Sequence, residues 1–307
     1  MRLHGKDALF YIPSVNSVRA ALTRAPDILE TGPPIRGNPK GSEMARIIAI
    51  SNQKGGVGKT TTAVNLAACL AIAEQRVLLV DMDPQGNATS GLGIDKNAVD
   101  KSLYDVLVNE IPIRDALQAT DLPYLAIAPA NTELVGAEVE LTSALAREHR
   151  LSDALRGIEA EFDYVLIDCP PSLGLLTING LTAADSVLIP LQTEYYALEG
   201  LTELTRTVRL IQRRLNPRLV LDGILLTLFD SRNRLNQQVA DDVRGHFGES
   251  VFRTVIPRNV RLGEAPSFGK PIILYDLRAK GATAYLDFAR ELLERHGVVR
   301  PALSRTA

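Results

Sequence analysis

A glycine-rich segment between an apolar run and a helical pattern most constrains what this chain can fold into. The segment reads Asn52-Gln53-Lys54-Gly55-Gly56-Val57-Gly58-Lys59-Thr60-Thr61-Thr62. It matches the end of the phosphate-binding pattern G-x-x-x-x-G-K-[ST], in which backbone N–H groups surround phosphates and the lysine contacts the terminal ones. The position of the first glycine holds Gln53, however, and a second lysine, Lys54, stands at the loop entrance. The segment therefore predicts a nucleotide-binding loop that carries one cation more than the general pattern.

Apolar runs and helical patterns alternate along the chain from residue 45 onward. The expected strands are 45–50, 76–81, 123–128, 163–168, 185–190, 221–228 and 251–255, and the expected helices are 59–74, 132–146, 150–160, 174–183, 198–215, 234–246 and 282–295. Residues 77–80 and 164–167 are apolar throughout rather than alternating, as is typical of strands buried on both faces. The alternation predicts an α/β fold, a doubly wound and mostly parallel sheet with helices on both faces. In such folds ligands bind beyond the carboxyl ends of the strands, where the loop at 52–58 would lie.

The chain is expected to have one domain between two flanking segments. Residues 1–43 are rich in proline and glycine, lack a sustained period and are expected to be a poorly ordered extension. Met44 directly precedes the first expected strand, which raises the hypothesis that translation starts there and that the extension is a start-site artefact. Residues 44–296 form the expected domain, and residues 297–307 form a short tail.

Composition argues against a membrane-spanning or secreted protein. The 307 residues are 46% apolar and 23% charged, an ordinary balance for a soluble protein, and no apolar stretch approaches the 18 residues of a membrane span. The N-terminus lacks the apolar run of a secretory signal, and two cysteines, Cys69 and Cys169, fit a reducing cytoplasm.

The two parts of the chain differ in charge. Residues 1–199 carry 16 Lys/Arg and 25 Asp/Glu, whereas residues 200–307 carry 18 and 11. One interpretation is that solvated helix faces differ by chance. The other is a basic surface on the C-terminal third that suits a polyanion.

Two groups of carboxylates follow expected strands, where a phosphate site needs them. They are Asp81-Met82-Asp83-Pro84-Gln85-Gly86-Asn87 and Asp168-Cys169-Pro170-Pro171-Ser172. Mg²⁺ prefers oxygen ligands and keeps several waters, so one or two carboxylates, the Thr60 hydroxyl and nucleotide phosphates suffice to hold it. In the loop, Gly55, Gly56 and Gly58 allow positive φ and close approach of the backbone to phosphate.

These motifs together resemble a known family. Further matching stretches are Glu194-Tyr195-Tyr196-Ala197-Leu198-Glu199-Gly200, Ile256-Pro257-Arg258-Asn259-Val260-Arg261-Leu262-Gly263-Glu264-Ala265-Pro266-Ser267 and Gly269-Lys270-Pro271-Ile272. Over about residues 44–296 the chain resembles the deviant Walker A ATPases, and within them the ParA/Soj chromosome- and plasmid-partitioning ATPases. The resemblance implies a slow, partner-stimulated ATP hydrolase that uses ATP and Mg²⁺.

The resemblance also implies roles for single residues of the site. Lys54 matches the signature lysine that crosses a nucleotide-sandwich dimer to the partner's ATP, and Asp83 matches the residue that orients the attacking water. Asp81 and Asp168 match positions near the Mg²⁺, with Thr60 as a direct contact. The nucleotide-binding positions correspond to Gly55, Gly56, Val57, Gly58, Lys59, Thr60, Thr61 and, beside the adenine, Pro257.

The resemblance further implies DNA binding and a protein partner. Arg232 matches a DNA-binding arginine of the family, and Arg258 and Arg261 fall in a region that also contacts DNA. A homodimer bridged by ATP would bind double-stranded DNA without sequence preference, because no base-reading module is evident. A ParB-type centromere-binding protein is expected to stimulate hydrolysis, and the protein is expected in the cytoplasm, associated with the nucleoid and not with the membrane.

Three alternatives remain open at this point. A MinD-like ATPase would end in a basic amphipathic helix on anionic lipid, but Gly297 and Pro301 interrupt such a helix here. An iron protein of the nitrogenase type would need suitably placed cysteines, whereas Cys69 and Cys169 are interpreted as small core residues. A nucleotide-dependent scaffold that positions protein cargo would use the same ATPase core without DNA.

Overall fold

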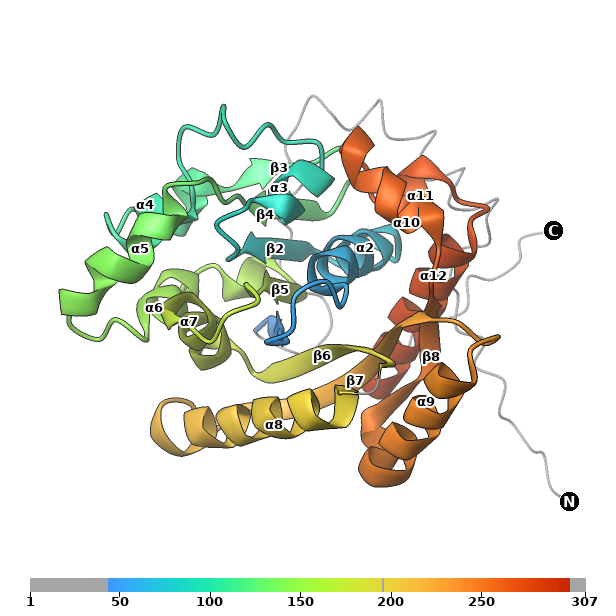
Figure 1. Cartoon of the computed structure of the whole chain (residues 1–307). Helices are drawn as coiled ribbons and strands as arrows, with labels where there is room; N and C mark the ends of the chain where they lie inside the picture. Colours follow the sequence, from blue (N-terminus) through green and yellow to red (C-terminus); the bar gives the residue numbers. More distant parts are fainter. Residues whose placement is uncertain (1–43, 195, 299–307) are drawn as a thin grey trace, which may run out of the picture.

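The computed structural model describes residues 44–194 and 196–298, which form one eight-stranded sheet with helices on both faces (Figure 1). The expectations for residues 1–43 and for the tail beyond residue 298 lie outside the described residues. The strands are β1 (Arg46–Ile50), β2 (Val77–Asp81), β3 (Gln118–Ala119), β4 (Leu125–Ala128), β5 (Tyr164–Asp168), β6 (Ser186–Gln192), β7 (Val220–Phe229) and β8 (Val251–Pro257). Their order is β3-β4-β2-β5-β1-β6-β7-β8, and every neighbouring pair is parallel except β3 with β4. The predicted fold class is confirmed.

The helices follow the expected order with several differences in length. They are α2 (Lys59–Ile72), α3 (Asn87–Gly91), α4 (Leu103–Leu107), α5 (Leu134–Glu140), α6 (Arg150–Leu155), α7 (Leu175–Ala183), α8 (Ala197–Arg214), α9 (Arg234–Phe247), α10 (Val260–Glu264), α11 (Ile272–Tyr275) and α12 (Lys280–Arg295). Short 3₁₀ turns are η2 (Ile113–Ala116), η3 (Leu141–Ser143), η4 (Glu159–Glu161), η5 (Gly248–Ser250) and η6 (Ala265–Phe268).

Two of the expected helices are shorter than predicted. The helix expected at 132–146 ends with η3, because the backbone turns extended at Ala144. The helix expected at 150–160 ends at Leu155, because Arg156 is not helical and Gly157 adopts a φ of +94°. Strand β3 and helices α3, α4, α10 and α11 were not predicted, since two to five residues are too few to show a period.

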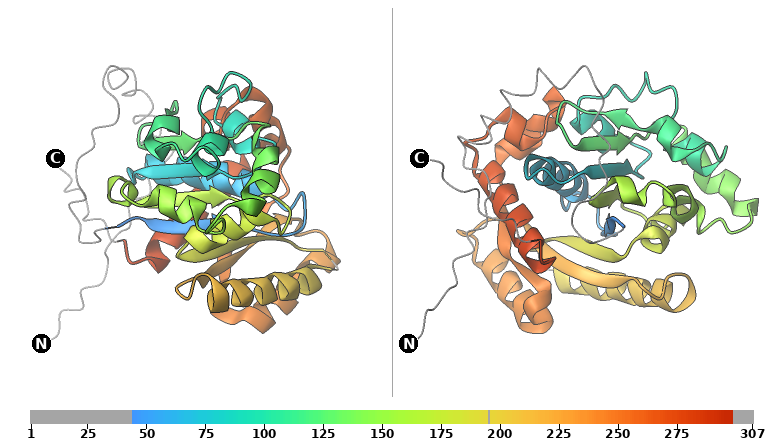
Figure 2. Two further views of the ribbon diagram at one scale, coloured as in Figure 1. Left: turned by 90° about the vertical axis from the view of Figure 1, so that its left-hand side faces the viewer. Right: turned by 180° about the vertical axis from the view of Figure 1, so that it is seen from behind.

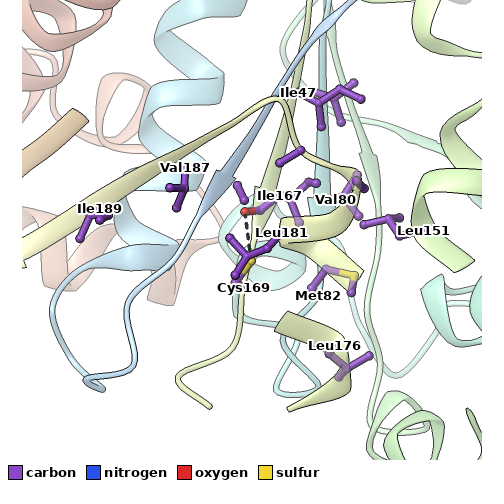
Figure 3. Close-up of a cluster of buried hydrophobic side chains, with 14 of the residues drawn as sticks. Ile47, Val80, Met82, Leu151, Ile167, Cys169, Leu176, Leu181, Val187 and Ile189 are labelled. Carbon is purple, nitrogen blue, oxygen red and sulfur yellow. Dashed lines mark hydrogen bonds between the residues drawn. The ribbon is translucent and has the colours of Figure 1, made fainter. Parts of the chain in front are cut away.

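The apolar strands supply both halves of the core. In β1, Ile48 and Ile50 join one apolar cluster while Ile47 and Ala49 join the other. The first cluster lies under α2, α11 and α12, and the second lies under α4 to α9; Figure 2 shows α8 and α9 together on their side of the sheet. Figure 3 shows part of the second cluster around Cys169. Burial on both faces explains why these strands do not alternate.

Helix α12 covers the edge strand β8 and packs on α2, the helix that follows the glycine-rich loop. The buried Glu291 carboxylate accepts hydrogen bonds of 2.8 Å from the backbone N–H groups of Arg253 and Thr254. Arg295 donates to the carbonyl of Val251 at 2.9 Å, and its guanidinium lies 3.9 Å above the ring centre of Phe252. The helix therefore satisfies polar groups that an edge strand would otherwise expose.

We expect Glu291→Ala to lower the free energy of unfolding by about 2–4 kcal/mol, because two partly buried N–H groups of β8 lose their acceptor. Urea denaturation measures the change. Glu294→Ala is the control, because among the described residues the Glu294 carboxylate pairs only with exposed Arg253, so this substitution should cost about 1 kcal/mol or less. Equal losses in the two variants would contradict this account of α12.

Candidate active site

The carboxyl ends of three adjacent strands bring the predicted site residues to one edge of the sheet. In the β2–β5 register Asp81 lies opposite Asp168, and in the β1–β5 register Ile50 lies opposite Asp168. The glycine-rich loop leaves β1 directly after Ile50 and enters α2 at Lys59. Both carboxylates therefore lie beside the loop, as the sequence predicts.

The loop has the backbone geometry of an anion cradle at the start of a long helix. Gly56 and Gly58 adopt φ of +74° and +86°, which strains any residue with a Cβ, whereas Gly55 is not among the described glycines with positive φ. The Thr227 hydroxyl of β7 donates to the carbonyl of Val57 at 2.8 Å and holds the loop against the sheet. The first N–H groups of α2 face the loop without a side-chain cap, an arrangement that favours anions.

Lys59 is buried beside this cradle. Its Nζ donates to the backbone carbonyl of Lys54 at 3.0 Å. Burial lowers the pKa of Lys59, while the carboxylates of Asp168 and Asp83 and the Cys169 thiol act in the opposite direction. A buried ammonium whose described partner is one carbonyl is ready to bind a phosphate oxygen.

Asp168 is the least satisfied of the carboxylates at this edge. Its side chain is fully buried, and neither oxygen has a hydrogen-bond partner of normal geometry among the described residues. Burial raises the pKa of Asp168 well above its usual value and the Asp81 carboxylate adds to this, while Thr60 and Lys59 oppose it. A hydrated divalent cation beside Thr60 would supply the missing donors, so the residues fit Mg²⁺.

Asp81, in contrast, is held by the protein. One carboxylate oxygen accepts from the backbone N–H and the hydroxyl of Thr89 at 2.8 and 2.7 Å, and the other accepts from the N–H of Asp83 at 3.2 Å. Burial raises the pKa of Asp81 to about 6 against these hydrogen bonds. Thr89 also accepts from the N–H of Ala130 at 3.0 Å, so it ties α3 to the end of β4. Nothing in the sequence marked Thr89 as part of the site.

Asp83 follows β2 and lies near Lys59. It is only 8% exposed, and its Oδ1 accepts from the N–H of Gln85 at 2.9 Å. That turn orients the carboxylate without using both of its oxygens. The arrangement leaves Asp83 able to orient a small polar molecule at the site.

The Lys54 side chain is paired with a carboxylate of its own chain. Its Nζ forms an ion pair with Glu194, a residue just beyond β6, and both side chains are about half exposed. The backbone N–H of Lys54 donates to the Asn52 side chain at 3.0 Å. The sequence marked both Lys54 and the segment from Glu194 but did not predict that they meet.

The three predicted DNA-binding arginines lie beyond the carboxyl ends of β7 and β8. Arg232 forms two hydrogen bonds of 3.0 Å with Asp230, and this pairing lowers the pKa of Asp230 to about 2. Arg258 follows Pro257, bonds through its N–H to the carbonyl of Phe229 and forms no ion pair with the described residues. Arg261 pairs instead with Glu264 at 2.8 Å and with Asp276 at 3.6 Å.

Comparison with known proteins identifies the family. The family model described as an AAA domain matches residues 45–221. The chromosome partitioning protein ParA of Myxococcus xanthus is 60% identical over 260 residues, which are 85% of this chain and 92% of that protein. The sporulation initiation inhibitor protein Soj of Bacillus subtilis is 59% identical over 81% of this chain and 98% of its own. The chain belongs to the ParA/Soj family.

A solved structure shares the ParA/Soj fold seen here. Cobyrinic acid a,c-diamide synthase of Mycobacterium smegmatis, with bound ADP and magnesium, is 40% identical and has a TM-score of 0.73. The match covers 84% of this chain and 98% of that one. Identity is higher with the partitioning proteins, which therefore decide the family.

Two further features of this ParA/Soj chain are its lack of a membrane-spanning helix among the described residues and the positions of its two cysteines. Within residues 44–194 and 196–298, no helix has the length and apolar character needed to cross a bilayer. Cys69 and Cys169 are buried in opposite apolar clusters, and burial raises the pKa of both thiols. The Cys169 thiol lies 3.9 Å from the carbonyl oxygen of Ile167 (Figure 3). Both cysteines therefore occupy core positions.

Proposed function

We propose that this chain is a ParA-type ATPase that hydrolyses ATP to ADP and phosphate with Mg²⁺. The observation that carries the proposal is the buried, unsatisfied Asp168 beside Lys59, Thr60 and the cradle of positive-φ glycines. The M. smegmatis relative, with its bound ADP and magnesium, supports the same ligands here. The metal would neutralise charge that develops on the transferred phosphoryl group.

Each residue at this edge of the sheet has a separate role in the proposed reaction. Lys59 and the N–H groups of the loop and α2 bind the phosphates. Thr60 and Asp168 would hold the hydrated metal, and Asp81, which stiffens the end of β2 through Thr89, would lie near it. Asp83 orients the attacking water, and Pro257 borders the adenine. Such catalysis consists mainly of positioning and electrostatic stabilisation.

We further propose that ATP bridges two protomers. Lys54 reaches the phosphates of the partner's nucleotide, so each protomer has an incomplete site by itself. The dimer doubles the basic surface that contains Arg232, Arg258 and Arg261, and it binds DNA without sequence preference. A ParB-type protein stimulates hydrolysis, which dissolves the dimer and releases the DNA. The protein would thus associate with the nucleoid in an ATP-dependent way.

Asp83→Ala tests the catalytic proposal. We expect ATP turnover to fall by about a hundredfold or more, because the attacking water loses its acceptor. ATP should then hold the variant as a persistent dimer that binds DNA. Phosphate release, and size-exclusion chromatography with ATP in the presence and absence of DNA, measure the two effects.

Asp100→Ala is the matched control, since Asp100 is an exposed aspartate outside the site. It should behave as the wild type in both assays. An Asp83→Ala protein that stays monomeric with ATP and does not bind DNA would contradict the proposed function. ATP-dependent binding to anionic vesicles instead of DNA would favour a membrane ATPase.

A further inference from the structure

The entrance of the glycine-rich loop is bound to the segment that runs from β6 into α8. Asn52 donates through its side chain to the carbonyl of Pro190 at 2.8 Å. The next residue, Gln53, donates to the Thr207 hydroxyl of α8 at 3.4 Å. Lys54, the third in the row, pairs with Glu194. Three successive residues thus contact the same neighbouring segment, and Lys54 is the outermost.

Glu194 is itself held in position. Its second carboxylate oxygen accepts from the side-chain amide of Gln192 at the end of β6. The preceding residue, Thr193, accepts through its carbonyl from Asn236 of α9 at 2.6 Å. The bond from Gln192 to the carboxylate and the bond from Asn236 to the preceding backbone make Glu194 a defined acceptor for Lys54 rather than a passing contact.

Both lysines of the loop therefore bind oxygen atoms of their own chain. Lys59 binds the carbonyl of Lys54, and Lys54 binds the carboxylate of Glu194. A carboxylate and a phosphate are both anionic oxygen acceptors for an ammonium group. Since the Lys54 and Glu194 side chains are 50% and 45% exposed, water and an incoming anion can reach the pair.

We propose that Glu194 is a positioning residue that holds Lys54 within its own protomer until a phosphate of the second protomer's nucleotide replaces the carboxylate. The inference rests on the proposed function of Lys54. Dimerisation then exchanges one ion pair for another in each protomer. Glu194 thereby weakens the association of two protomers in the absence of the nucleotide's terminal phosphate. Dimer assembly then depends on that phosphate.

Glu194→Gln tests this role in the full-length chain with AMPPNP and Mg²⁺. Without the competing carboxylate, the variant should dimerise more tightly, by about two- to fivefold for each protomer, the range measured for exposed ion pairs. The difference from the wild type should shrink as salt rises, because salt screens the pair that only the wild type contains. Sedimentation velocity over a series of protein concentrations gives the dissociation constants.

Glu199→Gln is the matched control, because Glu199 is an exposed glutamate in the first turn of α8 whose side chain has no hydrogen bond or ion pair to the described residues. It should leave the dissociation constant unchanged. An unchanged constant in Glu194→Gln would overturn the inference, and so would weaker association, which would make Glu194 a contact of the dimer.

Variants of Lys54 distinguish a failure of the role proposed for Glu194 from a failure of the bridging role proposed for Lys54. The gain in Glu194→Gln should require Lys54, so the double variant with Lys54→Gln should stay monomeric. A double variant that dimerises would overturn the role of Glu194. If Lys54→Gln alone dimerises normally, the proposed bridging fails instead.

Discussion

Replacing Lys54 with glutamine should abolish nucleotide-dependent dimerisation while nucleotide binding to the monomer remains. The in-chain cradle of Lys59 and the N–H groups of α2 stays intact in this variant. In the dimer, however, each protomer then lacks one charged hydrogen bond to phosphate. Hydrogen bonds to charged groups are worth about 1.5–3 kcal/mol each, so the absence of two weakens the dimer by about 3–6 kcal/mol. Sedimentation with AMPPNP and Mg²⁺, together with titration of a fluorescent ATP analogue, measures both effects.

Lys101→Gln is a close control for this prediction. Lys101 is 47% exposed at its side chain and pairs with Asp115 at 3.4 Å, so it resembles Lys54 in exposure and pairing but lies outside the site. It should dimerise as the wild type does. Dimerisation of Lys54→Gln at wild-type concentration would show that the extra lysine has another role.

Reversing the charge of Arg232 should remove most DNA binding and spare ATP-dependent dimerisation. In Arg232→Glu the new carboxylate lies two residues from Asp230, whose own charge is no longer paired, so the surface repels phosphate. Because each protomer then neutralises one phosphate fewer, the logarithmic salt dependence should become shallower by about two, and affinity should fall at least about tenfold. Fluorescence anisotropy with duplex DNA at several salt concentrations measures the change.

Arg156→Glu provides the comparison for Arg232. Arg156 is also an exposed arginine paired with a nearby aspartate, Asp153, but it follows α6 near the amino end of β5. This variant should bind DNA as the wild type does. Equal losses in the two variants would indicate a general effect of net charge, and intact binding in Arg232→Glu would overturn the assignment of this surface.

The structure also refines how the arginine surface works. Arg232 and Arg261 already bind carboxylates of their own chain, whereas Arg258 forms no ion pair with the described residues. Contact with a phosphate therefore competes with Asp230 at Arg232 and with Glu264 at Arg261. Arg258 does not have to break an ion pair first. Counting the arginines of the C-terminal third does not distinguish these cases.

Local patterns were sufficient for the parts of the fold that obey a local rule. Seven of the eight strands were predicted, most of them because an apolar run buried on both faces is visible in any window of five residues. The loop at 52–58 was predicted because its glycines and lysines stand at the spacing of a phosphate-binding loop. Strand β3 and the short helices were missed, since tertiary contacts rather than periodicity hold two to five residues in place.

By itself, the sequence determined the fold class, the glycine-rich loop, the aspartates at the strand ends and the family, because each depends on residue types at fixed spacing. Only the tertiary structure decided that Asp168 is left unsatisfied while Asp81 is bound by Thr89. It also decided that Lys54 meets Glu194, 140 residues away. Such pairings depend on strand order and register, which bring distant segments together, and no spacing along the chain encodes them.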